Sequence, residues 1–500
     1  MADTPVPPAP RSVSSSLPRW ARCVVAAVVG VCGLIALSSV GSASEPAVGA
    51  DASAVRGAAV GAGDAGAAPA SVAAASEAPR TGAAEEADPE PSAAEEKADE
   101  KNGAEGEGQV ADFPVPQFSS LAPIPKDLDF LAQAVLRDGK LVVEPPASAT
   151  AEQSIPTRTL TIDPRYQKEL TALLKSYAVP YGAIAAVEPA TGRVLALAEY
   201  SHAAPEMRGL PLKAVYPAAS VFKIVTGSAL LESGVSSDES VCFHGGKRRL
   251  SPKLLEDGKR DYRCNTLSEA MGHSLNVVFA KLADRKLDGK KLRATADKFG
   301  FNAPLSFDEP VDVSVARIPD SGFDLAKTAA GFGEVFLSPL HGALIAATVG
   351  NGGVMMSPVL FEGQQSDAGR VLDAATAKSV AAMCELTVSE GTARRAFRER
   401  GRPALGSIKA AGKTGSLHDK KPFRDFTWFV GWAPAEKPTV AVAAVVVNGP
   451  MWRVHAPYLG REALRLYVDP PQQQAPKAKA HKQTTRSKRM VSRAARFAAR

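Results

Sequence analysis

The feature that most restricts how this chain can fold is an acidic stretch rich in Ala, Gly and Pro, from Glu45 to Asp112. It contains 15 acidic and 4 basic side chains and almost no large apolar residues. Such a composition cannot bury enough apolar surface to offset the conformational entropy of an ordered chain. We therefore predict a disordered, self-repelling tether over residues 41–112, with the folded core after it.

An apolar run of 18 residues, Cys23–Val40, precedes the tether. Three arginines come before the run and acidic residues follow it, which is the charge asymmetry of a segment inserted with its N-terminus in the cytoplasm. The run is just long enough to span a bilayer, and Gly41–Ala43 supplies small residues for cleavage. Two alternatives stay open: an uncleaved anchor over 23–40 with a short cytoplasmic segment at 1–22, or a cleaved export signal. Both export the rest of the chain.

The end of the chain is basic, with nine Lys and Arg and no acidic residue from Pro471 to Arg500. The net charge of +6 therefore averages an acidic tether and a basic tail. We predict a disordered tail over 469–500, which is either a solvated extension or a segment attracted to anionic membrane or wall polymer. Nucleic acid is not expected as a partner outside the cytoplasm.

The pattern of apolar residues places one folded domain at 159–468, after a short lead-in segment at 113–158. The lead-in has a helical pattern at 127–136 and a strand at 140–144. In the domain, a helix and a hairpin are followed by several helices, three strands and a last helix. This order predicts an α/β protein of the α+β type, with an antiparallel sheet flanked by the N- and C-terminal helices and an inserted all-helical lobe. Strands are expected at 183–187, 194–198, 408–416, 427–432 and 440–447, and helices at 166–174, 276–286, 325–330, 339–349, 374–386 and 460–467.

A serine and a lysine three residues apart, Ser220 and Lys223, lie where an apolar helical run begins. Positions i and i+3 share one face of a helix, so the two side chains can touch. The apolar neighbours of Lys223 disfavour its ammonium form and lower its pKa. A neutral amine beside a hydroxyl is a base beside a nucleophile.

Two further elements follow in the chain. Ser274 and Asn276 lie at the corner between two predicted helices, where side chains can project into a cleft. The sequence Lys413-Thr414-Gly415-Ser416 lies on a predicted strand, and it supplies a positive charge, a glycine that permits close backbone approach, and hydroxyls that can hold a carboxylate.

The three elements in this order resemble the signature of penicillin-binding proteins and serine β-lactamases. Over Thr159–Val468 the chain is similar to a penicillin-binding protein transpeptidase domain, and one departure is Phe332, where relatives commonly carry glutamine. The resemblance implies a β-lactamase/transpeptidase-like fold. Weaker matches lie at 160–163, 167, 191–196, 331–334, 338–340, 351–353 and 391–393.

The resemblance also implies acyl transfer on the D-alanyl-D-alanine end of a peptidoglycan stem peptide. Ser220 would attack the penultimate carbonyl while Lys223 takes its proton, and Asn276 would orient Lys223 and the substrate amide. Ser274, with Lys413, would relay a proton to the departing D-alanine. An amine from a neighbouring stem, or water, would then resolve the acyl-enzyme.

The strand element would bind the substrate in this scheme. Thr414 and Ser416 would hold the terminal carboxylate, with Gly415 between them. The backbone N–H groups of Ser220 and Ser416 would form the oxyanion hole. The resemblance implies that no metal and no organic cofactor is needed, and the seven histidines show no paired ligand spacing.

Two of the five cysteines, Cys242 and Cys264, bracket a polar loop. In an oxidising compartment they can form a disulfide, and the sequence alone does not decide whether they do. Cys384 is expected to be an ordinary buried helix residue.

The resemblance further implies a monofunctional enzyme in the bacterial cytoplasmic membrane, with its catalytic domain on the periplasmic or extracytoplasmic side, or secreted if the signal is cleaved. Too few residues precede the domain for a glycosyltransferase. Stem peptides, β-lactam inhibitors and other cell-wall synthesis proteins would be its partners.

Two other functions stay open: a class D-like β-lactamase or penicillin-sensing domain, and a non-catalytic wall-binding protein. The first matches Phe222 and the run Trp428–Trp432, but Asn276 stands where such enzymes usually have an apolar residue. The intact set of motif residues argues against the second. The serine chemistry is common to transpeptidation and carboxypeptidation, so the sequence does not separate these two.

Overall fold

The computed structural model describes residues 115–116, 130–144, 156–246, 249–451 and 453–469, all within one compact unit. The predicted tether, the apolar run at 23–40 and the basic segment at 471–500 lie outside these residues. Within the described part of the chain, no helix has the length and apolar character needed to cross a membrane.

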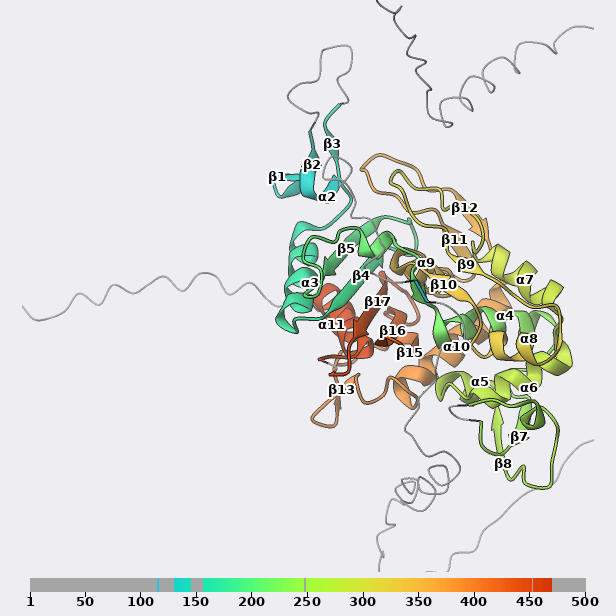
Figure 1. Cartoon of the computed structure of the whole chain (residues 1–500). Helices are drawn as coiled ribbons and strands as arrows, with labels where there is room; N and C mark the ends of the chain where they lie inside the picture. Colours follow the sequence, from blue (N-terminus) through green and yellow to red (C-terminus); the bar gives the residue numbers. More distant parts are fainter. Residues whose placement is uncertain (1–114, 117–129, 145–155, 247–248, 452, 470–500) are drawn as a thin grey trace, which may run out of the picture. The chain divides into compact units, whose positions relative to one another are not determined.

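A five-stranded antiparallel sheet forms the centre of the domain, in the order β15-β16-β17-β4-β5 (Figure 1). Because β15 is an edge strand, one of its sides is open to a ligand. The hairpin predicted near Pro189–Gly192 is present as β4 and β5. The strands are β4 (Tyr181–Val187), β5 (Val194–Tyr200), β15 (Ala411–Lys420), β16 (Phe423–Ala433) and β17 (Val440–Asn448).

Helices cover both faces of this sheet. On one face α3 (Pro164–Ser176) and α11 (Ala456–Val468) share a core with the sheet, in which Tyr166 and Leu459 pack with Phe429. The other face packs on α9 (Pro339–Gly350) and on the inserted lobe. The first helix begins where Asp163 accepts a hydrogen bond from the Tyr166 N–H, at 2.9 Å, as an N-cap does. The predicted arrangement of sheet and terminal helices is therefore confirmed.

The lobe is mostly helical, and it also carries two small sheets. Its helices are α4 (Lys223–Glu232), α5 (Leu267–Gly272), α6 (Asn276–Lys286), α7 (Gly289–Lys298), α8 (Gly322–Ala329) and α10 (Ala374–Ser389). One small sheet has the order β6-β10-β9 and the other pairs β7 with β8. These strands are β6 (Tyr216–Pro217), β7 (Ser240–Phe243), β8 (Arg263–Thr266), β9 (Val315–Ala316) and β10 (Val335–Leu337).

Short elements complete the described chain. They are the 3₁₀ turns η3 (Leu210–Leu212), η4 (Ala219–Phe222) and η5 (Pro252–Leu254), and the paired strands β11 (Val354–Met356) with β12 (Ala368–Arg370) and β13 (Arg398–Glu399) with β14 (Arg402–Pro403).

The lead-in segment differs from its prediction. The helix α2 covers only Phe130–Gln133, and β1 (Val135–Arg137) then pairs with β2 (Lys140–Val143) and β2 with β3 (Arg158–Thr159). The expected helix at 127–136 therefore ends early, and residues 127–129 lie outside the described chain. Asp138 and Gly139 have φ of 48° and 76°, and such a pair of left-handed residues makes the tight turn of a hairpin.

Most of the other predicted elements are confirmed. Helix α6 has the predicted bounds, and Thr266 opens α5 with a capping box. Helix α7 was not predicted, because its apolar positions are few among lysines. The strand expected to begin at Ile408 begins instead at Ala411 and continues to Lys420.

Candidate active site

Ser220 lies on the 3₁₀ turn η4, immediately before α4. The sequence predicted a continuous α-helix here, so this is a correction. The contact with Lys223 is kept, because side chains at i and i+3 eclipse one another in a 3₁₀ turn. A hydrogen bond from β16 holds the segment before this turn: the indole N–H of Trp428 donates to the carbonyl oxygen of Pro217 at 2.8 Å.

The backbone before the nucleophile adopts an uncommon conformation. Ala219 has φ of 48°, in the left-handed region that residues with a side chain rarely adopt. Gly331 fits closely against it: a Cβ at this glycine would lie 2.6 Å from the Ala219 carbonyl oxygen. Ser220 itself is 3% exposed. Ser220 is thus presented by a turn that a glycine from another segment supports.

Lys223 is fully buried and has three oxygen partners. Its Nζ lies 2.8 Å from Ser220 Oγ, 2.6 Å from Asn276 Oδ1 and 2.7 Å from the Ala330 carbonyl oxygen. Burial, and secondly the nearby charge of Lys413, lowers the pKa of Lys223 well below its ordinary value. This is the direction that its apolar neighbours predict, although the ring nearest to Nζ, at 5.6 Å, belongs to Phe279 on α6.

The corner between α5 and α6 places Ser274 and Asn276. Helix α5 ends at Gly272 and α6 begins at Asn276, as predicted. Ser274 has φ of 57°, so the chain turns sharply there. Asn276 is completely buried and reaches Lys223, whereas Ser274 is partly exposed. The corner thus serves both lysines of the site, since Ser274 meets the second one.

Lys413 is the second buried lysine, on the edge strand β15. Its Nζ donates to Ser274 Oγ and to the Thr414 carbonyl oxygen, each at 2.9 Å. Burial lowers its pKa from 10.5 to about 7. The thiol of Cys384 nearby has its pKa raised to about 12 by burial, so it stays neutral. Lys413 can therefore gain or lose a proton near neutral pH.

The rest of the motif on β15 faces the open edge. Thr414 is hydrogen-bonded through its hydroxyl to that of Thr392, at 2.6 Å, and Ser416 is exposed. Gly415 is buried, and a Cβ there would lie 3.2 Å from the Ala218 carbonyl oxygen. This strand therefore approaches the turn that carries the nucleophile.

The structure brings the five predicted catalytic residues into two hydrogen-bonded groups. One is Ser220–Lys223–Asn276 and the other is Ser274–Lys413. Three contributors were not found from the sequence as parts of the site: the Ala330 carbonyl, the Phe279 ring and the Thr392 hydroxyl. A backbone carbonyl carries no sequence signal, and nothing in the local pattern marks Phe279. Thr392 stands in a short Gly-Thr-Ala match to the family, which was the available signal.

Cys242 and Cys264 are joined by a disulfide between the directly paired strands β7 and β8. Among the residues with described positions, no three His, Cys, Asp or Glu side chains are grouped as a metal site would require.

Comparisons with known proteins agree with this geometry. Peptidoglycan D,D-transpeptidase PbpA of Mycobacterium tuberculosis is 29% identical over 344 residues, which cover 58% of this chain and 67% of that protein. Stage V sporulation protein D of Bacillus subtilis is 27% identical over 326 residues, covering 58% of this chain and 49% of the relative. The chain thus spans about half to two thirds of the length of these curated relatives.

Solved structures of the same fold are also similar. The imipenem acyl-enzyme complex of penicillin-binding protein A from M. tuberculosis aligns with a TM-score of 0.50 and 25% identity, covering 61% of this chain and 78% of that one. The D,D-transpeptidase domain of a peptidoglycan glycosyltransferase from Eggerthella lenta has the same TM-score and identity, with coverage of 62% and 81%.

The family described as penicillin binding protein transpeptidase domain matches residues 182–459, which is more than half of the 500 residues and contains every side chain of the site. The turn with Ser220, the start of α4 with Lys223, the corner with Ser274 and Asn276, and the edge strand β15 all fall inside that match, and the chain belongs to this family.

Proposed function

We propose that this protein is a serine D,D-transpeptidase, or a D,D-carboxypeptidase, that acts on the D-Ala-D-Ala end of peptidoglycan stem peptides. The observation that carries the proposal is the set of partners around Lys223: three oxygens within 2.8 Å of one buried amine, one of them the Ser220 hydroxyl. The name of one relative, peptidoglycan D,D-transpeptidase PbpA, supports the substrate class.

The hydrogen bonds around Lys223 suit a general base. A neutral amine has two N–H donors and one lone pair. Asn276 Oδ1 and the Ala330 carbonyl can only accept, so they take the two N–H groups. The lone pair is then left for the Ser220 hydroxyl, which must donate. Lys223 would remove the Ser220 proton as Oγ attacks the penultimate carbonyl, and the Oγ–C bond would form.

The Ser274–Lys413 pair would deliver a proton to the leaving group. When the tetrahedral intermediate collapses, the C–N bond breaks and the amine of D-alanine needs a proton. Ser274 Oγ is held by Lys413 at 2.9 Å, and Lys413 has a pKa of about 7, so the pair can supply that proton near neutral pH. The proton that Lys223 removed from Ser220 would afterwards return to the Ser274–Lys413 pair and replace the one given to D-alanine.

The edge strand would position the substrate. The hydroxyls of Thr414 and Ser416 would bind the terminal carboxylate, beside the positive charge of Lys413. The backbone N–H groups of Ser220 and Ser416 would stabilise the oxyanion. An amine of a second stem peptide would then attack the acyl-enzyme and form the cross-link, or water would release it.

The apolar run at 23–40 supports anchoring in the cytoplasmic membrane, with the catalytic domain outside. A β-lactam would acylate Ser220 in place of the substrate. This inhibitor class is supported by the neighbouring structure, which is an imipenem acyl-enzyme complex of a relative.

Labelling with a fluorescent penicillin tests the proposal on the purified protein. Wild type should form a stable adduct, and Ser220→Ala should form none. Ser228→Ala is a matched control, because Ser228 is a buried serine on the helix that follows, α4, and its hydroxyl bonds only the Ile224 carbonyl among the contacts described. Equal labelling of Ser220→Ala and wild type would overturn the assignment, and rapid release of hydrolysed drug would favour a β-lactamase.

A further inference from the structure

A disulfide-closed hairpin projects from the lobe next to the catalytic corner. Strands β7 and β8 pair with Cys242 opposite Cys264, and the two cysteines are bonded. Strand β8 runs directly into α5, whose end leads to Ser274 and Asn276. Gly246 of the hairpin packs against Val277, since a Cβ there would lie 2.7 Å from the Val277 Cβ. The hairpin is thus attached to the element that carries two of the catalytic residues.

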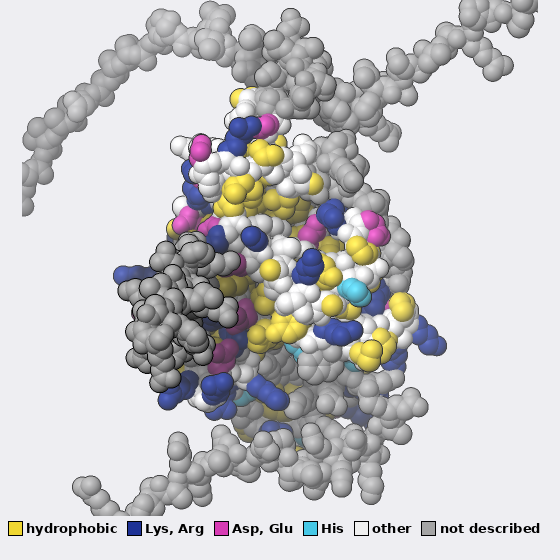
Figure 2. All heavy atoms as spheres, turned by 90° about the vertical axis from the view of Figure 1, so that its left-hand side faces the viewer, with side chains coloured by type: hydrophobic (Ala, Val, Ile, Leu, Met, Phe, Trp, Pro, Cys, Tyr) yellow, Lys and Arg dark blue, Asp and Glu magenta, His cyan; other side chains and the backbone are white. Residues whose placement is uncertain are grey.

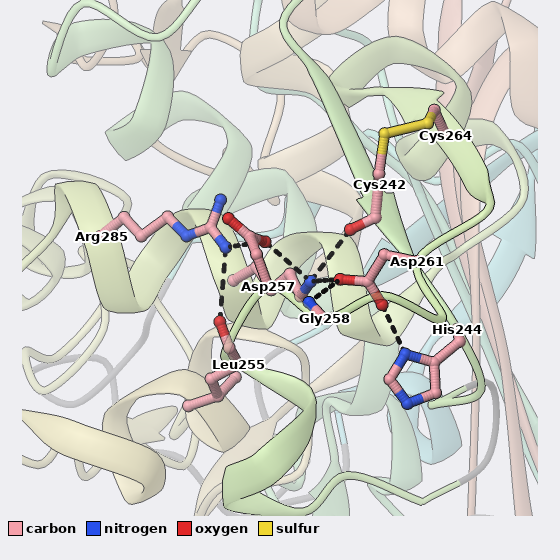
Figure 3. A network of polar contacts seen from close by, with 9 residues as sticks. Cys242, His244, Leu255, Asp257, Gly258, Asp261, Cys264 and Arg285 are labelled. Carbon is pink, nitrogen blue, oxygen red and sulfur yellow. Dashed lines mark hydrogen bonds and ion pairs between the residues drawn. A yellow bond between two sulfur atoms is a disulfide. The ribbon is translucent and has the colours of Figure 1, made fainter.

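Two of the acidic side chains in this hairpin are turned toward the lobe (Figure 3). Lys281 on α6 is 1% exposed, and its Nζ lies 2.6 Å from Asp261 and 3.1 Å from Asp257. Arg285 also pairs with Asp257, at 2.6 Å, and His244 contacts Asp261. Hydrogen bonds from Lys281 and His244 hold the pKa of the Asp261 carboxyl well below its usual range, so it stays ionised. These acids are therefore neutralised by the helix behind them.

The basic side chains of the hairpin remain outside. The described residues 249–263 contain five Lys and Arg and three Asp and Glu, and two of the three acids are those bound to α6. Lys253, Lys259, Arg260 and Arg263 are exposed, and none has a carboxylate partner among the described residues. By contrast, Figure 2 shows the face on the left of Figure 1, where Lys and Arg lie scattered among acidic and hydrophobic side chains. Four exposed cations thus lie on the hairpin that leads into α5.

Tyr262 lies among these cations and is 73% exposed. A tyrosine ring offers a large apolar surface with a polar end, and it can pack against the apolar face of a sugar ring. A partner that combines anionic groups with sugars therefore matches both parts of this surface. An un-cross-linked peptidoglycan strand has both, since its stem peptides end in carboxylates.

We propose that the exposed surface of this hairpin formed by Lys253, Lys259, Arg260, Tyr262 and Arg263 binds un-cross-linked peptidoglycan strands through the carboxylates of their stem peptides, and so holds the substrate polymer for the active site. This inference rests on the proposed function for the identity of the polymer. Strand β8 continues into α5, and α5 ends at the corner that carries Ser274 and Asn276, so a peptidoglycan strand held on the hairpin would be held on the segment that leads into the site. The basic side chains of the hairpin would bind the polymer without taking part in the acyl transfer.

The test measures binding of the full chain, in detergent and carrying Ser220→Ala, to fluorescently labelled un-cross-linked strands. The double variant Lys259→Glu with Arg260→Glu removes part of the charge. The matched control is Lys168→Glu with Lys437→Glu, two exposed lysines on α3 and after β16. We expect the hairpin variant to bind about tenfold more weakly at 50 mM salt, with a smaller difference at 300 mM salt, and the control to bind as the parent does.

Two further arms identify the ligand. Strands whose carboxylates have been amidated should bind the parent and the hairpin variant equally weakly. Vesicles with anionic phospholipid should not show the difference between the variants. Equal strand binding by the hairpin variant and the control, retention of the difference on amidated strands, or a difference seen only on vesicles would each overturn the proposal.

Penicillin labelling of the same variants with Ser220 restored separates this inference from the proposed function. Labelling equal to wild type shows that the hairpin variant is folded. Absence of penicillin labelling in the wild-type protein would refute the proposed chemistry. The binding of peptidoglycan strands by the variants would then still decide the inference about the hairpin.

Discussion

Replacing Lys413 by methionine should stabilise the protein while abolishing its chemistry. The side chain is fully buried, and its pKa falls from 10.5 to about 7. A lowered lysine pKa means that the unfolded chain binds the proton more tightly than the folded one. The charged lysine therefore lowers the free energy of unfolding, and this loss is complete below pH 7 and disappears as the pH rises toward 10.5. At about 1.36 kcal/mol per pKa unit, it amounts to roughly 5 kcal/mol at low pH.

The pH dependence isolates this penalty from other effects of the substitution. Between pH 7 and pH 9 the folded lysine loses its proton while the unfolded one keeps it. The stability advantage of Lys413→Met over wild type should therefore shrink by about 2 kcal/mol over this interval. The lost hydrogen bonds to Ser274 and Thr414 lower the absolute gain, but they change little with pH.

Urea unfolding followed by tryptophan fluorescence measures the difference, since Trp428 and Trp432 are fully buried in the sheet. Lys168→Met, at an exposed position on α3, is the control and should show a difference that does not vary with pH. A pH-independent difference for Lys413→Met as well would refute the view that this site holds a destabilised ammonium. Penicillin labelling of the variant should fall at least tenfold.

Three other changes test separate parts of the site. Asn276→Asp keeps the oxygen 2.6 Å from Lys223 but adds a negative charge, which raises the pKa of Lys223. The pH profile of penicillin acylation should therefore move to higher pH by about one unit or more. An unmoved profile would contradict Lys223 as the base. Gly331→Ala places a Cβ 2.6 Å from the Ala219 carbonyl oxygen at a φ of 97°. It should lower the free energy of unfolding in urea by about 2 kcal/mol and slow acylation. Wild-type values for both would contradict the view that Gly331 supports the turn at Ala219. Replacing Cys242 and Cys264 by serine opens a loop with a sequence separation of 22 and should lower the free energy of unfolding by about 3 kcal/mol. Penicillin labelling should persist at low temperature, where the variant is still folded. An unchanged free energy of unfolding would show that the loop is ordered without the disulfide.

The parts of the fold that could be predicted are those with a local physical signal. The apolar spacing after Asn276 indicates where α6 lies, and its bounds were predicted correctly. The edge strand was found as well, but its first residue was not, since the apolar residues Ile408 and Ala410 extend the pattern in front of Ala411. Helix α7 was missed because its stability comes from packing of Leu292 and not from a strong pattern of its own.

The candidate site divides in the same way. The contact between Ser220 and Lys223 follows from a spacing of three residues, which brings the side chains together in an α-helix and in a 3₁₀ turn alike. Contacts between residues far apart, such as Lys223 with Asn276, were suggested only by the order of the motifs. The left-handed conformation of Ala219 had no signal, because it depends on the approach of Gly331 from a distant segment.

The Ala330 carbonyl shows why side chains alone do not define this base. If Lys223 had only Ser220 and Asn276 as partners, one of its N–H groups could point at Ser220, and the serine would then accept instead of donate. The carbonyl, 2.7 Å away, occupies that N–H. With both N–H groups taken by oxygens that cannot donate, only the lone pair remains for Ser220, and the serine proton points at its acceptor before substrate arrives. This holds only while the amine is neutral, and burial together with the charge of Lys413 favours that form. The two lysines are therefore coupled: the one that holds a charge near neutral pH is Lys413, and its charge helps to keep Lys223 in the neutral form that the proposed role of a base requires.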